Sequence, residues 1–293
     1  SCLQMLQRFR RWLDDHPDQP LFLHFELIPD RLPPALREAI AGFPDGVLQF
    51  EIGVQSFDPQ VQTLIDRRQD DEATEANIRW LRTATGAHLH VDLIAGLPGE
   101  TIGGFAAGFD RLVAMNPHEI QVGLLKRLRG TPLAQRGSTL GLVFAPDPPY
   151  TIVSSPWLVA EEVIRLARFA RHWDLIGNSG RFRRSLPWLL GEAPFANFMV
   201  LSDYLNTRIG ATHGVAFERW AEALHEFVQR LPADASQAVI DDYRASGASG
   251  RPAFLTRGIA GRGTGAGAWR ASRPDRQSTV LVHAPSRRHD TSH

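Results

Sequence analysis

The chain has 293 residues, which is enough for one large α/β domain or two smaller ones. Its 32 lysines and arginines balance 32 aspartates and glutamates, so no net field attracts nucleic acid or an anionic membrane. The single cysteine excludes an internal disulfide framework, and no apolar run approaches the ~20 residues of a membrane-spanning helix. Composition therefore predicts a cytoplasmic protein without a membrane partner.

The first predicted element is an amphipathic helix at the start of the chain. Its apolar positions, Leu3, Leu6, Phe9 and Leu13, follow the spacing of one buried helix face. No charged and then apolar leader comes before it. The pattern therefore predicts a chain that starts within a domain.

Strands and helices then alternate up to Lys126, which is typical of parallel βα units. Asp58 and Pro59 mark one helix start as an N-cap and a first-turn proline, and Asp71 marks another. A glycine turn after the third strand leads directly into a further helix. The predicted strands are Leu21–Leu27, Val47–Ile52, His88–Ala95 and Glu119–Leu125.

A proline cluster separates this region from a helical one. Pro146, Pro148 and Pro149 resist both helix and sheet, so residues 137–154 are predicted to be a linker. Residues 155–231 are predicted to form a small helical accessory domain. Its expected helices run from Ser155 to about His172, from Pro194 to Ile209, and from Phe217 to Leu231.

Residues 232–293 are predicted to be a disordered tail rich in glycine, alanine and arginine, because they offer little apolar surface to offset chain ordering. The excess of arginine in this tail allows two interpretations, a nucleic-acid-binding arm or a solvated segment. The second is favoured, so nucleic acid is not an expected partner.

Polar residues alternate with apolar ones along each predicted strand, so one face of the sheet is apolar and the other is polar. Two arrangements explain this alternation: a barrel with a ligand-holding interior, or a sheet with one solvated face. The first is favoured because βα connections normally cover both faces of a sheet with helices. The polar positions are His24, Glu26, Gln49, Glu51, His88, His90, Asp92 and Gln121.

The histidines of this polar face raise the question of a metal site. His88 and His90 stand two apart on one strand, which places both rings on the same side. Nothing in the spacing sets a coordination geometry, and histidines on strands are commonly cavity or core residues. No metal ligand is therefore predicted.

Four segments, in this order, resemble the radical SAM enzymes, specifically the branch whose members also contain a cobalamin-binding domain. The resemblance implies that residues 1–136 form the C-terminal half of a partial (βα)6 TIM-like barrel, an α/β fold. The helical region that follows resembles the accessory domain of one uncharacterised subgroup. The four segments are HFELIPD from His24, FEIGVQSFDPQVQTLIDRRQ from Phe50, VDLIAGLPGET from Val91 and PHEIQVGLLKRLRGTPLA from Pro117.

The resemblance also implies cofactors: S-adenosylmethionine, a 4Fe-4S cluster and, in this branch, cobalamin. It implies an electron donor such as a flavodoxin or ferredoxin, and a small-molecule or other substrate that radical chemistry modifies. By position in the motifs, the implied cofactor-binding residues are Glu26, Glu51, Gln55, Arg67 and Asp92. No catalytic residue is assigned.

The chemistry of these residue types suits the implied ligand. Glu26 could accept hydrogen bonds from the ribose hydroxyls, and Arg67, on the helix that follows Pro59, could pair with the methionyl carboxylate. Gln55 and Asp92 could hold the remaining polar groups. Glu51 matches the residue that this branch of the family has at the same position, and its chemistry indicates no further role.

The chain departs from the family in one respect: it lacks the CxxxCxxC loop that ligates the cluster, and Cys2 is part of no such motif. That loop and the cobalamin-binding domain are expected upstream, so this fragment is expected to be inactive alone. Two alternatives stay open. The chain could be a non-catalytic binding module that uses the helical domain and the basic tail, or an ordinary TIM-barrel enzyme, although no convincing phosphate-binding turn is present.

Overall fold

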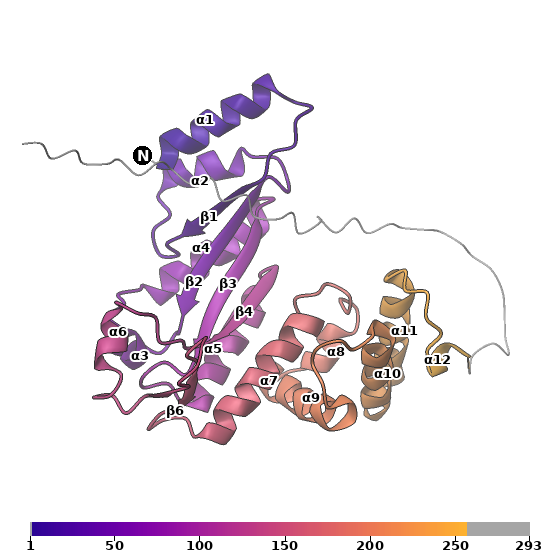
Figure 1. Cartoon of the computed structure of the whole chain (residues 1–293). Coiled ribbons are helices and arrows are strands. Elements are labelled where there is room, and N and C mark those ends of the chain that lie inside the picture. Colours follow the sequence, from indigo (N-terminus) through magenta and orange to yellow (C-terminus); the bar gives the residue numbers. More distant parts are fainter. Residues whose placement is uncertain (1, 257–293) are drawn as a thin grey trace, which may run out of the picture.

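The structure, a computed structural model, describes residues 2–256 and contains a parallel sheet, a helix pair at one end and a helical region at the other (Figure 1). The sheet order is β1-β2-β3-β4 and every neighbouring pair is parallel. These strands confirm the four predicted ones, although β2 extends beyond Ile52. The bounds are β1 Leu23–Leu27, β2 Leu48–Gln55, β3 His88–Ala95 and β4 Glu119–Leu124.

The helices of the α/β part begin where side chains cap them. The carboxylate of Asp58 accepts hydrogen bonds from the first-turn amides of α3, and Asp70 accepts one from Ala73 in α4. Thr101 caps α5 in the same way. These helices are α3 Pro59–Leu64, α4 Asp71–Ala84 and α5 Ile102–Met115; α1 Cys2–Asp15 and α2 Pro34–Ala41 lie at the β1 end.

One face of the sheet is buried against α4 and α5, which lie behind it in Figure 1. The apolar residues at alternate positions of β2 and β3, among them Ile52 and Val91, are buried, as are Leu81 of α4 and Phe105 of α5. Burial of each such side chain stabilises the fold by roughly 1.5–3 kcal/mol. This core holds the strands in the register that aligns their polar side chains on the opposite face.

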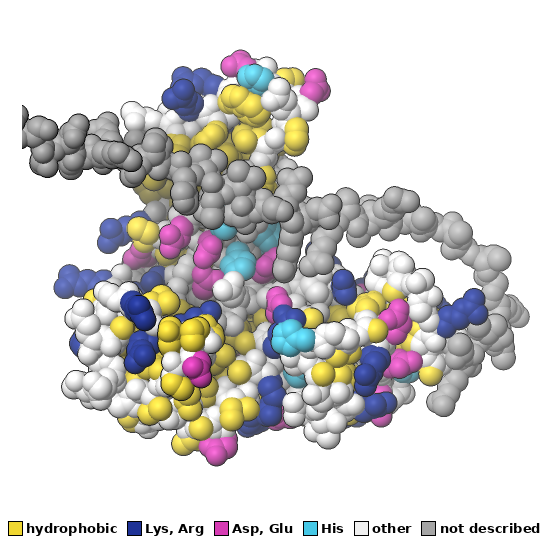
Figure 2. Space-filling model, in the orientation of Figure 1, with side chains coloured by type: hydrophobic (Ala, Val, Ile, Leu, Met, Phe, Trp, Pro, Cys, Tyr) yellow, Lys and Arg dark blue, Asp and Glu magenta, His cyan; other side chains and the backbone are white. Residues whose placement is uncertain are grey.

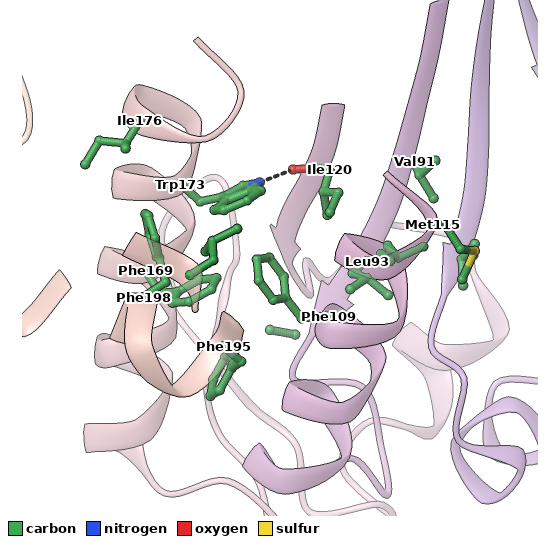
Figure 3. Close-up of a cluster of buried hydrophobic side chains, with 14 of the residues drawn as sticks. Val91, Leu93, Phe109, Met115, Ile120, Phe169, Trp173, Ile176, Phe195 and Phe198 are labelled. Atoms are coloured by element: carbon green, nitrogen blue, oxygen red, sulfur yellow. Dashed lines mark hydrogen bonds between the residues drawn. The ribbon is translucent and has the colours of Figure 1, made fainter. Parts of the chain in front are cut away.

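The helical region packs directly on the sheet (Figure 3). The ring of Phe109 in α5 meets Phe169 and Trp173 of α7 edge to face, with ring centroids 5.0 and 4.8 Å apart. The indole N–H of Trp173 donates to the carbonyl of Ile120 in β4 at 2.9 Å. The two regions therefore share one core. The helices are α7 Ala160–Ile176, α8 Leu186–Leu190, α9 Pro194–Ile209, α10 Phe217–Phe227, η1 Val228–Arg230, α11 Ala233–Ala245 and α12 Ala253–Thr256.

The predicted linker has regular structure of its own. Within 137–154, β5 (Val143–Phe144) and β6 (Ile152–Ser154) form an antiparallel hairpin, which the prolines turn rather than interrupt. A short helix, α6 (Pro132–Arg136), comes just before it. Ile152 is buried and hydrogen-bonds to the backbone of Leu125, so the hairpin is attached to the end of β4.

The prediction of disorder for residues 232–293 is wrong for the part that the structure describes. Helix α11 buries Ala235, Val239 and Tyr243, which are four residues apart along the chain and therefore lie on one helix face. The prediction averaged the apolar content over the whole tail and so overlooked this short apolar helix face. Residues 257–293 lie outside the described residues. Between residues 2 and 256, no helix is long and apolar enough to cross a membrane.

Candidate functional site

Histidine and acidic side chains gather on the face of the sheet that α4 and α5 leave open (Figure 2). The strand register places them in rows across the sheet. In one row Glu26 of β1 lies beside Glu51 of β2, which is followed by His90 of β3 and Glu119 of β4. One row nearer the carboxyl ends lie Gly53, Asp92 and Gln121.

His90 is the centre of the hydrogen bonding in these rows. Its Nδ1 lies 3.2 Å from Oε2 of Glu119 and its Nε2 lies 2.7 Å from Oε1 of Gln121. Nε2 is also 3.3 Å from Oδ1 of Asp92. Asp92, and then Glu119, raise the pKa of His90 to about 10, against the effect of burial. His88 and His90 together lower the pKa of Glu119.

The polar face is open on the β1 side and sheltered near β3. His24 and Glu51, which form an ion pair at 3.3 Å, are each 46% exposed in their side chains, whereas Asp92 is 13% exposed. Glu26 is exposed, and it has no hydrogen-bond or ion-pair partner among residues 2–256. Four strands cannot close a barrel, so the described residues do not by themselves enclose the interior predicted from the sequence.

Gln55 lies at the carboxyl end of β2 in an unusual conformation. Its φ of 70° is in the left-handed region, and the pairing with β3 shifts by one residue between Gly53 and Gln55. The side-chain amide folds back over Gly53, because a Cβ built there would lie 2.7 Å from Nε2 of Gln55. Gly53 therefore leaves the space that the Gln55 amide occupies.

Arg67 lies in the loop that joins α3 to α4, not on the helix expected from the sequence. Its Nη2 donates to the carbonyl oxygen of Gly53, and its Nε donates to Gln69 at 2.9 Å. Burial lowers the pKa of Arg67, while the charges of Asp30 and Asp71 act in the opposite direction. The guanidinium is thus held at the end of β2.

The structure places Glu26, Glu51 and Asp92 on one face of three adjacent strands, Gln55 at the carboxyl end of β2, and Arg67 in the loop after α3. Glu26 and Glu51 are neighbours across β1 and β2, and Asp92 lies beside Gly53. Gln55 and Arg67 both contact Gly53, the first by packing and the second by a hydrogen bond. Gly53 joins the group although it was not among the predicted site residues.

Sequence reasoning also missed Glu100, whose side chain joins two of the motifs. It is 1% exposed, and it accepts hydrogen bonds from the Ser56 hydroxyl and the Gly96 amide, both at 3.2 Å. Burial raises its pKa to about 8. A signal was present: Thr101 supplies the cap of α5, which leaves Glu100 outside the helix and next to the glycine turn.

The described residues do not fit an iron–sulfur cluster or another metal ion. Between residues 2 and 256, no group of three histidine, cysteine, aspartate or glutamate side chains has the arrangement of a metal site. The one cysteine of the sequence, Cys2, is exposed on α1. A 4Fe-4S cluster needs several thiolates, which this chain cannot supply.

Comparison with known proteins gives sequence relatives for part of the chain. Oxygen-independent coproporphyrinogen III oxidase of Thermostichus vulcanus is 35% identical over 77 residues, covering 26% of this chain and 24% of that enzyme. The enzyme of Bradyrhizobium diazoefficiens is 40% identical over 77 residues, covering 26% and 17%. The chain thus spans about a quarter or less of these relatives.

Among solved structures, coproporphyrinogen III oxidase (HemN) from Escherichia coli, described as a radical SAM enzyme, has a TM-score of 0.43 and 22% identity. The match covers 59% of this chain and 37% of HemN. Part of the chain is related in sequence to oxygen-independent coproporphyrinogen III oxidases. The radical SAM methyltransferase TsrM from Kitasatospora setae, with cobalamin and a [4Fe-4S] cluster bound, has a TM-score of 0.45 and 15% identity, over 83% of this chain and 50% of TsrM.

A second match lies in the later part of the chain. The family described as "Protein of unknown function (DUF4080)" matches residues 138–258, a range that includes the β5–β6 hairpin and the helices from α7 to α12.

Proposed function

We propose that this chain supplies the S-adenosylmethionine-binding part of a radical SAM enzyme. The observation that supports the proposal is that Glu26 and Asp92 lie on one face of the parallel sheet, while Gln55 ends β2 and Arg67 hydrogen-bonds to Gly53 near that end. Ligand sites of parallel α/β folds lie at this end of the strands. The sequence relationship to oxygen-independent coproporphyrinogen III oxidases supports the same class of ligand.

The residues present fit such a ligand. The carboxylate of Asp92 accepts no hydrogen bond from the described residues at either oxygen, and the exposed carboxylate of Glu26 has no partner among them. Both are acceptors that a molecule with hydroxyl and ammonium donors would satisfy. Gly53 lacks a side chain, which lets the Gln55 amide lie over β2 beside Asp92.

Each residue then has a separate task in the proposed site. Glu26 accepts hydrogen bonds from the ribose hydroxyls, and Asp92 and Gln55 hold the other polar groups of the nucleoside and amino acid parts. Arg67 pairs with the methionyl carboxylate. Its Nε and Nη2 already donate to Gln69 and Gly53, so Nη1 is the nitrogen without a partner among residues 2–256.

When bound, S-adenosylmethionine supplies a carbon–sulfur bond that one-electron reduction can break. The reducing cluster would have to be held by cysteines other than Cys2, so no step through it is derived from this chain. Cobalamin is a further cofactor of the proposed enzyme, by relation to the branch that carries it. The tasks of the chain's own residues are to bind and orient the sulfonium ligand.

The experiment is anaerobic iron–sulfur reconstitution of the full-length gene product, followed by measurement of 5′-deoxyadenosine after addition of S-adenosylmethionine and a reductant. We expect cleavage by the wild type, and tighter binding of S-adenosylmethionine than in the Glu26→Gln and Asp92→Asn variants by on the order of tenfold. Glu192→Gln, a change of an exposed residue between α8 and α9, is the matched control. A cluster-loaded wild type that cleaves no S-adenosylmethionine contradicts the proposal.

A further inference from the structure

The histidine in the middle of the polar face, His90, makes contacts that belong to a doubly protonated ring. Its Nδ1 faces a carboxylate oxygen of Glu119 at 3.2 Å, and its Nε2 faces the amide oxygen of Gln121 at 2.7 Å. Oxygens of these two kinds accept hydrogen bonds, so each ring nitrogen must donate. A ring that donates from both nitrogens is an imidazolium.

The same ring lies against Asp92, two residues further along β3 and on the same face. Nε2 of His90 is 3.3 Å from Oδ1 of Asp92, close enough for charge attraction although not aligned as a hydrogen bond. This oxygen, Oδ1, is buried. Oδ2 of Asp92 makes no hydrogen bond or ion pair with any residue from 2 to 256, so it is the oxygen that a ligand can reach.

We propose that His90 is a positioning residue of the nucleoside site: clamped by Glu119 and Gln121 of β4, its ring holds Asp92 in the orientation that presents Oδ2 to the ligand. The proposal rests on the function proposed above, since it assumes that Asp92 contacts the bound nucleoside. It goes further in assigning a task to β4, which supplies none of the five predicted site residues.

The charges around the ring favour this arrangement. Glu119 of β4, Asp92 of the same strand as His90, and Glu51, the register neighbour of His90 on β2, are all carboxylates, while no lysine or arginine between residues 2 and 256 forms a hydrogen bond or ion pair with the ring. Among residues 2–256, His88 is the other histidine that forms an ion pair with Glu119, at its Oε1, 3.4 Å away. The positive charge of His90 thus stands among acids, which raise its pKa to about 10.

The test is a double-mutant cycle that measures binding of S-adenosylhomocysteine to the full-length gene product by calorimetry. We expect His90→Phe and Asp92→Asn each to weaken binding by on the order of tenfold, and the double variant to be no weaker than Asp92→Asn alone. His90→Gln, which keeps a donor near Asp92, should restore part of the affinity. His88→Asn is the matched control, since it removes a contact with Glu119 but none with Asp92.

A second readout needs no ligand. In wild-type protein the His90 ring, followed by NMR through its carbon and nitrogen shifts, should stay protonated above pH 8, and Asp92→Asn should lower its titration midpoint.

The outcomes separate the two proposals. If the wild type binds S-adenosylhomocysteine and the losses of binding free energy in His90→Phe and Asp92→Asn are additive, the role of His90 is overturned and the proposed function stands. If His90 titrates with Asp92 as expected but wild type binds no nucleoside, the proposed function fails, and with it the role of His90 in ligand binding. If His90→Phe shows no thermal unfolding transition, the variant does not fold. The proposal is then tested by the affinity of His90→Gln and by the NMR titration of His90.

Discussion

At the scale of single residues, the most unusual environment in the described chain is that of Glu100. Its carboxyl is buried, joins Ser56 after β2 to Gly96 after β3, and has a pKa raised to about 8. A folded-state pKa above the unfolded value of 4.5 means that the folded protein binds the proton more tightly. The stability that this group contributes is complete below pH 4.5 and is lost as pH rises through 8.

We therefore expect the contribution of Glu100 to the free energy of unfolding to fall between pH 4.5 and pH 8, by up to a few kcal/mol. Glu100→Gln, which cannot ionise, should remove this part of the pH dependence. Urea unfolding at several pH values measures the slope, with exposed Glu192→Gln as control. His90 also makes stability depend on pH, in the wild type and in Glu100→Gln alike. Its pKa is raised to about 10, so the stability that its protonated ring contributes is lost from pH 6.5 upward. Equal slopes in wild type and Glu100→Gln would contradict the expectation.

Gly53 allows a second test at this scale. A methyl group at this position would come within 2.7 Å of Nε2 of Gln55, the mobile end of a flexible side chain. Gly53→Ala should therefore displace the Gln55 amide, leave the melting temperature close to that of wild type, and weaken S-adenosylhomocysteine binding several-fold. Gly103→Ala on α5 is the control, because a Cβ at this position would lie 3.9 Å from the Thr101 hydroxyl, an ordinary contact. Gly46→Ala is unsuitable, because the φ of 80° at Gly46 would strain an alanine. Unchanged affinity in Gly53→Ala would remove Gln55 from the site.

At the scale of elements, the packing of α11 depends on one buried carboxylate. Asp242 is 4% exposed and accepts hydrogen bonds from the backbone amides of Arg184 and Ser185, and from the Ser185 hydroxyl at 2.8 Å. These donors lie at the start of α8. Asp242 therefore holds the segment that begins α8 against the helix formed by the first residues of the predicted tail.

Asp242→Ala should lower the free energy of unfolding by about 3 kcal/mol, because several buried donors lose their acceptor together. Asp241→Ala is the matched control: its side chain is 40% exposed and, within the described part of the chain, its carboxylate contacts only Gln237 and Arg244, so the expected loss is within ~0.5 kcal/mol. Thermal unfolding followed by circular dichroism compares the two. Similar losses for both variants would show that the network around Asp242 does not stabilise α11.

At the scale of the whole molecule, the sheet and the helical region are joined by the aromatic contacts of Phe109 (Figure 3). This ring is fully buried and touches Phe169, Trp173 and Phe195, which come from α7 and α9. A hydrophobic core that includes both regions makes them unfold as one cooperative unit.

Phe109→Ala should cost about 3–5 kcal/mol and shift the unfolding of both regions together. Tryptophan fluorescence and circular dichroism should give the same transition midpoint in wild type and in the variant. Trp173→Phe, which keeps an aromatic ring but loses the hydrogen bond to Ile120, should cost about 1 kcal/mol. Two separated transitions would mean that the regions are independent domains.

Much of the fold could be predicted from short-range patterns. The alternation in β1 to β4, the N-cap at Asp58 and the first-turn proline at Pro194 depend on residues within a few positions of one another, so they are visible in the chain itself. The polar face of the sheet follows from the same alternation. The error over α11 has the same origin: an average over the glycine-rich tail concealed a stripe with a spacing of four residues.

The partners of the polar residues could not be predicted in this way. His90 meets Glu119 and Gln121 across 29 and 31 residues of sequence, and Ser56 meets Glu100 across 44. Sequence alone determined which residue types lie on the polar face and at the strand ends, because side-chain direction repeats with a local period. The register between strands decided which of them touch, because pairing across a sheet depends on the packing of the whole core.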